Sequence, residues 1–340
     1  MKTLNSRFIV YADFLGTTHR YSKPALLVHG RELLEQALAR CVVPHLITDD
    51  MYLYVYSDTA IVTCPRLRPL LKPLADLFGH FLELHDVSGN DDMTLWLRAA
   101  ISHGTVLGVE HLKTSDHIRT IPLLDTSLPA AYHLESIRKG SRVFVDPGIP
   151  DGSFAECETL FFKWQQITGH GDYAANVREY LWPAKHYEGN DLDNRLVRKT
   201  LKLNEWWAGE LKSREWTPED YKKSGIIQVD ETLKLFVRTC SSFCSNDRKK
   251  EVLFSLLPTT EEPHDDVHFK WGLWFQALRG IVEGCDLDQP TTLEVKTVFE
   301  IVRSILVAND YFRHFVSELK LPDYAPFRTK LCEMRLVESD

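Results

Sequence analysis

Residues 7–18 read RFIVYADFLGTT, an apolar run that ends at one aspartate and a glycine-containing turn. Residues 7–12 are rich in β-branched and aromatic side chains, so they predict a short buried strand. Asp13 closes that strand, and Gly16, Thr17 and Thr18 mark the turn that follows. The stretch therefore predicts a carboxylate at a strand end, directly before a loop.

A second stretch, residues 51–64, reads MYLYVYSDTAIVTC and predicts two strands joined tightly at Ser57 and Asp58. Leucines and alanines at helical spacing over residues 25–42 predict a helix between the first strand and this hairpin. In a β-α-β-β order the first strand and the hairpin pair side by side in the sheet. We therefore expect Asp13 and Asp58 to converge on one point.

The following elements extend the same pattern. The sequence predicts a helix at 67–84, a strand at 95–102 turned by His103 and Gly104, a short helix at 128–138 and a strand at 142–145. This order is typical of a split β-α-β fold of the α+β class, with helices on one face of a mostly antiparallel sheet.

The second half of the chain has a different character. After about residue 183 strand-like runs become rare, and prolines separate long helical periodicities at 193–213, 230–241, 267–283 and 292–319. We expect one domain over residues 1–186 and an α-helical C-terminal domain over 187–340. A length of 340 residues also favours two domains.

Composition narrows the class of protein. A formal net charge of −8 argues against a general nucleic-acid binder, which would show a basic face. Seven irregularly spaced cysteines are interpreted as reduced thiols, with a zinc site at Cys240 and Cys244 as the weaker alternative. No secretory or membrane-spanning segment is evident in the sequence, so we expect a cytoplasmic protein without membrane or nucleic-acid partners.

The two aspartates predict a particular chemistry. Adjacent carboxylates repel each other unless a cation neutralises them, and hard oxygen ligands suit Mg²⁺ or Mn²⁺. Phe14 offers a backbone carbonyl as a third ligand. Backbone N–H groups of Phe14, Leu15, Gly16 and Thr17 are expected to bind phosphate oxygens, with Gly16 permitting close approach. Two such metal ions clamp both sides of a phosphoryl transfer.

The order of motifs resembles the class III nucleotidyl cyclases. Residues 10–16 (VYADFLG) resemble their first metal-binding strand, residues 56–58 (YSD) their second metal-binding hairpin, and residues 97–104 (LRAAISHG) their next core strand. Residues 131–135 (AYHLE) and 140–145 (GSRVFV) resemble the helix and strand that close that domain. The resemblance covers about residues 6–183 and implies a cyclase catalytic domain over 1–186 that uses two divalent metal ions.

The detailed sequences of these motifs, together with LWP at 181–183, resemble those of the pyrimidine cyclases of bacterial Pycsar anti-phage systems. That branch implies conversion of UTP or CTP to the 3′,5′-cyclic monophosphate, a second messenger in anti-phage defence. It also implies a homodimer with sites at the subunit interface.

Several positions depart from the purine cyclases. Tyr54 stands where those enzymes carry a base-reading lysine, so we expect it either to contact a pyrimidine or to pack as a cross-strand aromatic. Pro129 and His133 replace the usual asparagine and arginine. Arg98 is the candidate to supply the missing cation, or else an ion pair that holds the sheet. His133 and Lys163 are further candidates for phosphate contact.

Three alternatives remain at this level. One is a purine cyclase making cyclic AMP or cyclic GMP, which Tyr54 disfavours. Another is a catalytically silent module of the same fold that binds nucleotide or a partner. A third is a scaffold whose helical half uses Trp206, Trp207, Trp271 and Trp274 as an interface, although aromatics at helical spacing more often form core.

Overall fold

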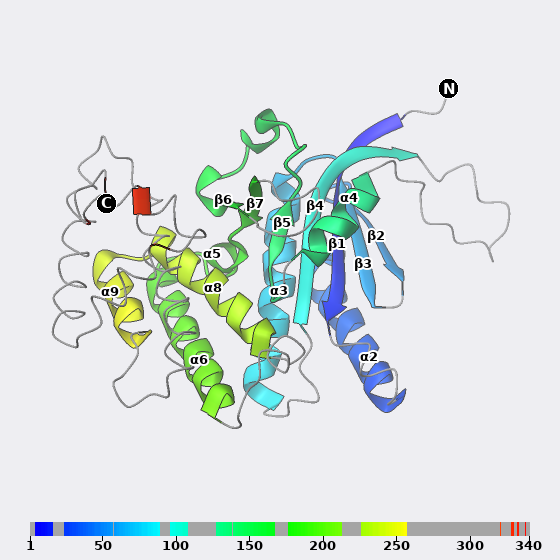
Figure 1. Cartoon of the computed structure of the whole chain (residues 1–340). Helices are drawn as coiled ribbons and strands as arrows, with labels where there is room; N and C mark the ends of the chain where they lie inside the picture. The colour runs from blue at the N-terminus through cyan, green and yellow to red at the C-terminus, as the bar shows by residue number, and fades with distance from the viewer. Residues whose placement is uncertain are drawn as a thin grey trace. The chain divides into compact units, whose positions relative to one another are not determined.

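A computed structural model describes most of the first 256 residues and a few positions beyond them (Figure 1). The described residues are 4–15, 24–56, 58–88, 96–107, 127–137, 139–166, 176–212, 226–256, 320, 328–329, 332 and 337. The predicted helices at 267–283 and 292–319, with Trp271 and Trp274, lie outside them. So do Gly16 and Thr17 of the predicted phosphate loop.

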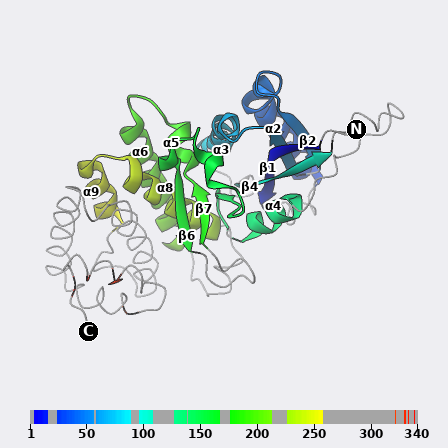
Figure 2. The ribbon, with the colours of Figure 1, turned by 90° about the horizontal axis from the view of Figure 1, so that it is seen from above.

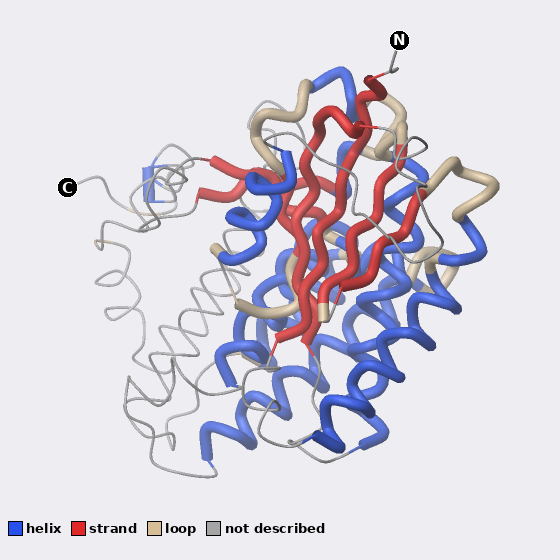
Figure 3. The backbone as a smooth tube through the Cα atoms, turned by 90° about the vertical axis from the view of Figure 1, so that its right-hand side faces the viewer, coloured by secondary structure: helices blue, strands red, loops and turns tan. Residues whose placement is uncertain are grey.

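The first unit is built on one sheet of seven strands in the order β2-β3-β1-β4-β5-β7-β6 (Figure 3). The strands are β1 (Leu4–Leu15), β2 (Tyr52–Tyr56), β3 (Thr59–Cys64), β4 (Trp96–Leu107), β5 (Val143–Val145), β6 (Phe162–Gln166) and β7 (Asn176–Tyr180). Every neighbouring pair is antiparallel except β4 with β5. The predicted α+β class with a mostly antiparallel sheet is confirmed.

Strand β1 is central because both of its faces bury side chains. Phe8, Val10, Ala12 and Phe14 are buried on one face, and Ile9 is buried on the other. Helices α2 (Pro24–Cys41) and α3 (Arg68–Ser88) lie on the first side of the sheet, and α4 (Ser127–Ser136) lies on the second (Figure 2). The prediction that the helices lie on one face is therefore wrong, because α4 packs against Tyr11 on the other.

Two features of the sheet were not predicted. Strand β4 does not turn at His103 and Gly104 but continues to Leu107, because the start of β1 pairs with it through Arg7↔Gly104 and Phe8↔His103. The hairpin of β6 and β7 was missed because both strands are short and carry charged or amide side chains between apolar ones. These two strands extend the sheet beyond β5, and β6 is the edge strand.

The chain divides into two compact units, and each unit consists of two separate segments of the sequence. The first comprises 1–188 and 217–232, and the second comprises 189–216 and 233–340. Within the described residues the second unit is helical, through α6 (Leu192–Lys212), most of α8 (Ile226–Phe243) and α9 (Asn246–Ser255). Helix α8 begins in the first unit and ends in the second. The predicted boundary between residues 186 and 187 stays a prediction.

The beginning of α8 is tied into the first unit by a buried ionic triad. The Arg142 guanidinium donates to both carboxylate oxygens of Glu179, at 2.5 and 2.8 Å, and to Glu231 of α8 at 2.5 Å. Arg142 is 2% exposed and Glu179 is fully buried. The two carboxylates raise the pKa of Arg142 although its burial opposes this. A fully hydrogen-bonded arrangement is what makes such buried charges tolerable.

Backbone contacts fix the same junction. Gly140 has φ +85°, and a Cβ atom there would lie 2.7 Å from the Cβ of Glu231, so glycine is required for two reasons. The N–H of Ser141 donates to the Thr232 hydroxyl at 2.9 Å, and the Trp182 indole donates to the Ser141 carbonyl at 2.8 Å. Residues 226–232 are therefore an integral part of the first unit.

None of the helices in the described ranges is both long enough and apolar enough to cross a membrane.

Candidate functional site

The candidate site lies on the α4 side of the sheet, where Asp13 stands in a row of cross-strand neighbours. Asp13 pairs with Thr59 of β3 and with Arg98 of β4, and Thr59 pairs with Tyr56 of β2. Directly opposed residues in a sheet share a face, so these four side chains lie on one side of it. The Thr59 hydroxyl donates to Asp13 Oδ1 at 3.2 Å, and Arg98 Nη2 lies 3.5 Å from Asp13 Oδ2.

The turn between β2 and β3 brings Asp58 close to this row. The N–H of Phe14, the residue after Asp13, donates to the Asp58 backbone carbonyl at 3.2 Å. The Asp58 side chain is partly exposed and its charge acts on Asp13. The structure thus brings the two aspartates into one neighbourhood, as the strand order predicts.

Burial and the neighbouring Asp58 carboxylate both act on the pKa of Asp13. Burial raises its pKa above the ordinary value, and the charge of Asp58 raises it further. The Arg98 cation and the Thr59 hydroxyl act in the opposite direction, but the net shift is upward. A bound cation between the two carboxylates would favour the ionised form of both.

Arg98 is held from two sides. Its Nε forms an ion pair with Glu135 of α4, whose side chain is 1% exposed, while Nη2 approaches Asp13. Burial lowers the pKa of Arg98 and the neighbouring Asp13 partly restores it. The guanidinium therefore links α4 to the strand that carries Asp13, and it lies beside the candidate site at the same time.

A row of tyrosines flanks the aspartates. Tyr54 pairs with Ile61, which pairs with Tyr11, and the three side chains pack together with Ile9 and Leu128. Burial raises the pKa of Tyr54. Tyr54 therefore lies one cross-strand row from Asp13 on the same face, with its ring half-buried.

The remaining predicted residues are distributed more widely. Phe14 points to the opposite face, where its ring packs against Phe81 at 4.9 Å, so that only its backbone is available to the site. His133 is exposed on α4 and contacts Tyr132. Leu15 ends β1 opposite Trp96. Lys163 lies on β6, which β4, β5 and β7 separate from β1, so the structure does not bring it to Asp13.

Sequence reasoning missed Thr59, Tyr11 and Glu135. Thr59 follows Asp58 directly, and the hairpin register alone decides that its hydroxyl faces Asp13. Tyr11 precedes Asp13 by two residues, so strand alternation places it on the same face. Glu135 belongs to the motif at 131–135, but its burial beside Arg98 is visible only in the structure.

The candidate metal site offers few side-chain donors for a hard divalent cation. In the ranges that the structure describes, no group of three or more His, Cys, Asp and Glu side chains could hold a metal ion. Asp13, Asp58 and the Phe14 carbonyl offer oxygen donors only. Mg²⁺ commonly keeps several waters and takes its other ligands from substrate phosphates, so this set is compatible with it.

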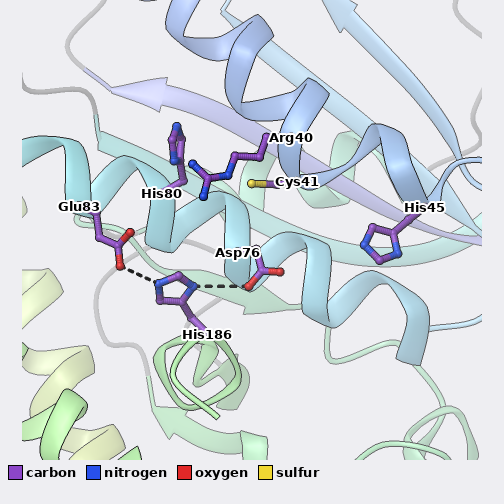
Figure 4. A pocket seen from close by; sticks show the side chains of 7 residues that line it. All are labelled: Arg40, Cys41, His45, Asp76, His80, Glu83 and His186. Carbon is purple, nitrogen blue, oxygen red and sulfur yellow. Dashed lines mark hydrogen bonds and ion pairs between the residues drawn. The ribbon is translucent and has the colours of Figure 1, made fainter. Parts of the chain in front are cut away.

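A separate polar cavity of about 290 Å³ lies on the other side of the sheet, among α2, α3 and α5 (Trp182–His186) (Figure 4). His186 Nδ1 lies 3.5 Å from Asp76 and Nε2 lies 3.2 Å from Glu83. Burial lowers the pKa of His186, but hydrogen bonds to the two carboxylates outweigh it and the net shift is upward. A Cβ atom on Gly79 would lie 2.3 Å from this imidazole. The His186 ring therefore lies between Asp76 and Glu83 and packs directly over Gly79 of α3.

Comparison with known proteins finds neither a family model nor a curated protein that matches the chain. Among solved structures, the guanylyl cyclase Cya2 is 15% identical, with a TM-score of 0.37 over 53% of this chain and 92% of that one. An adenylate/guanylate cyclase/hydrolase from Silicibacter pomeroyi is 12% identical, with a TM-score of 0.38 over 53% of this chain and 97% of that one.

An adenylate cyclase from Trypanosoma brucei is 12% identical, with a TM-score of 0.35 over 52% of this chain and 88% of that one. Similarity at this level carries no assignment of substrate or activity, which must come from the residues of the site.

Proposed function

We propose that the first unit is a metal-dependent nucleotidyl cyclase that acts on a pyrimidine nucleoside triphosphate. One observation carries the proposal: Asp13, near the end of a central strand, lies beside the turn that holds Asp58, and the Phe14 N–H donates to the Asp58 carbonyl there. Paired carboxylates at a strand end with open coordination are suited to two-metal phosphoryl transfer.

Asp13, Asp58 and the Phe14 carbonyl would hold the divalent cations. Bound there, Mg²⁺ or Mn²⁺ would neutralise the triphosphate and acidify the ribose 3′-hydroxyl. In the proposed reaction the 3′-oxygen forms a bond to the α-phosphorus, the bond to the bridging oxygen breaks, and pyrophosphate and a proton are released.

The chain's own groups would position the reactants. The backbone N–H groups of Leu15, Gly16 and Thr17 are proposed to bind the phosphates. The Phe14 N–H, which was predicted to belong to this set, donates to the Asp58 carbonyl instead. Arg98, fixed by Glu135, supplies a nearby positive charge that favours developing negative charge on the phosphates. Positioning and electrostatics provide the catalysis without a covalent intermediate.

Tyr54 is proposed to contact the base. It lies on the same face as Asp13, one row along and two strands across, and its partly buried ring would leave less room for a purine than for a pyrimidine. A pyrimidine, UTP or CTP, is therefore the preferred substrate, and a purine triphosphate is the alternative.

Exposed tyrosines on the site face bear on how the protein assembles. Tyr52, Tyr56 and Tyr132 on the site face are 52%, 70% and 53% exposed, and large exposed aromatics favour a surface covered by a partner. We therefore propose a homodimer with its sites at that face. In the cytoplasm it would make a cyclic pyrimidine nucleotide that serves as an anti-phage second messenger.

The test incubates the full-length protein with each of the four ribonucleoside triphosphates and Mn²⁺, and separates the products by chromatography. We expect a cyclic pyrimidine monophosphate and pyrophosphate from the wild type. Asp13→Asn and Asp58→Asn should each reduce turnover by at least about 100-fold, as loss of a metal ligand does. Asp151→Asn, which changes a 90% exposed carboxylate elsewhere, is the matched control.

Near-normal turnover in either ligand variant would remove that residue from the mechanism. Product from ATP or GTP alone would favour the purine alternative. Nucleotide binding without any product would favour a catalytically silent binding module.

A further inference from the structure

We infer that Thr59 is a positioning residue for the metal-binding carboxylate of Asp13, and that Tyr11 in turn positions Thr59. The inference rests on the proposed function, because it concerns how Asp13 is presented to a divalent cation. It adds two residues to the candidate site that contact neither the proposed metal nor the substrate.

The hydrogen-bond geometry has a defined direction. The Thr59 hydroxyl donates to Asp13 Oδ1 at 3.2 Å, and the Tyr11 hydroxyl lies 3.5 Å from the same Thr59 oxygen. A threonine hydroxyl has one hydrogen to donate, so once it is given to Asp13 the oxygen can only accept from Tyr11. The three groups thus form a short chain that runs from Tyr11 through Thr59 to Asp13.

The Thr59 side chain is restrained. It is 8% exposed, lies in the first position of β3 and is β-branched, which limits its χ1 rotamers. Tyr11 is also restrained, since its ring packs edge-on against Tyr132 of α4 at 5.6 Å. The donor that reaches Asp13 is therefore fixed from both the sheet and the helix.

The two oxygens of Asp13 are held by different groups. Thr59 holds Oδ1, whereas Arg98, anchored by Glu135, lies beside Oδ2. A neutral hydroxyl orients the carboxylate without cancelling its charge, and each carboxylate oxygen keeps further lone-pair capacity. Outer hydrogen bonds of this kind commonly fix the orientation of metal ligands.

The test measures Mn²⁺ affinity of the full-length protein by titration calorimetry without nucleotide, so that it does not depend on turnover. Thr59→Val keeps the volume and removes the hydroxyl, and Thr59→Ser keeps the hydroxyl. We expect Thr59→Val to weaken Mn²⁺ binding by about 10-fold, within the range seen for outer-shell partners, and Thr59→Ser to restore most of the loss.

Tyr11→Phe should weaken Mn²⁺ binding in the same direction but less, because it removes only the distal donor. Tyr187→Phe changes a tyrosine beside His186 on the other side of the sheet, so it is the matched control and should leave the affinity unchanged. In the double variant of Thr59→Val and Tyr11→Phe the loss should equal that of Thr59→Val alone, since the two groups act in series.

The outcomes separate the two levels of the proposal. If Asp13→Asn loses Mn²⁺ binding while Thr59→Val binds like the wild type, the positioning role is refuted and the proposed function stands. Additive losses in the double variant would refute the serial arrangement. If Asp13→Asn itself binds Mn²⁺ like the wild type, the metal site of the proposed function is refuted.

Discussion

Replacing Arg142 by methionine should strongly destabilise the first unit. Arg142 is the only cation in the triad with Glu179 and Glu231, and all three side chains are almost fully buried. Methionine has a similar length but removes the guanidinium that both buried carboxylates contact. Removing one partner of a buried ion pair typically costs about 3–5 kcal/mol of unfolding free energy.

Glu231→Gln provides the contrast within the same triad. Glu179 still contacts Arg142 through two hydrogen bonds in that variant, and the glutamine carbonyl can accept the third. The remaining arginine and glutamate balance each other, so we expect a cost of about 1 kcal/mol or less. Arg31→Met, which breaks an exposed pair with Glu35 at 2.7 Å, is the surface control and should cost no more than about 1 kcal/mol.

The assay is urea unfolding followed by circular dichroism and by tryptophan fluorescence, for which Trp182 is a probe beside Ser141. Equal losses in Arg142→Met and Glu231→Gln, or a loss below about 1 kcal/mol in Arg142→Met, would contradict the electrostatic account.

The remaining predictions concern the contact between His186 and α3. Gly79→Ala should destabilise by about 1–3 kcal/mol in thermal unfolding, because its Cβ meets the His186 ring, whereas Gly209→Ala has open space in its helix and should be neutral or stabilising. A raised histidine pKa contributes stability that is complete below about pH 6.5 and is lost as pH rises through the folded value. The difference in unfolding free energy between wild type and His186→Gln should therefore be larger at pH 6 than at pH 9. A constant difference would mean that the imidazole contributes packing alone. The lowered pKa of Asp76 adds stability that is present above about pH 4 and is lost as pH falls through the folded value.

The sequence predicted the parts of the fold that depend on local patterns. The apolar run before Asp13 and the tyrosine-rich hairpin around Asp58 have strong strand periodicity, and the predicted residues lie in β1, β2 and β3. Strand β1 nevertheless extends beyond its predicted run at both ends, to Leu4 and Leu15, so Asp13 does not close it. The neighbourhood of the two aspartates followed from element order alone. Whether they bind metal stays a prediction.

Features that depend on pairing register could not be predicted. Strand β4 continues past Gly104 because β1 begins earlier than its apolar run suggests, whereas the glycine at 104 indicated a turn. The hydroxyl of Thr59 meets Asp13 only because their strands align residue for residue. The contact of Glu231 with Arg142 joins segments far apart in the chain, which periodicity within either segment cannot reveal.

The path of α8 has a consequence for how this chain can be divided. A fragment ending at residue 186 would retain Arg142 and Glu179 but lose Glu231, and the Ser141 amide would lose its acceptor on Thr232. The first unit is thus discontinuous in sequence, and exchanging everything after 186 for an unrelated domain would remove a piece of its own interior. Chimeras that keep residues 217–232 and join the foreign partner inside α8 are the ones we expect to fold.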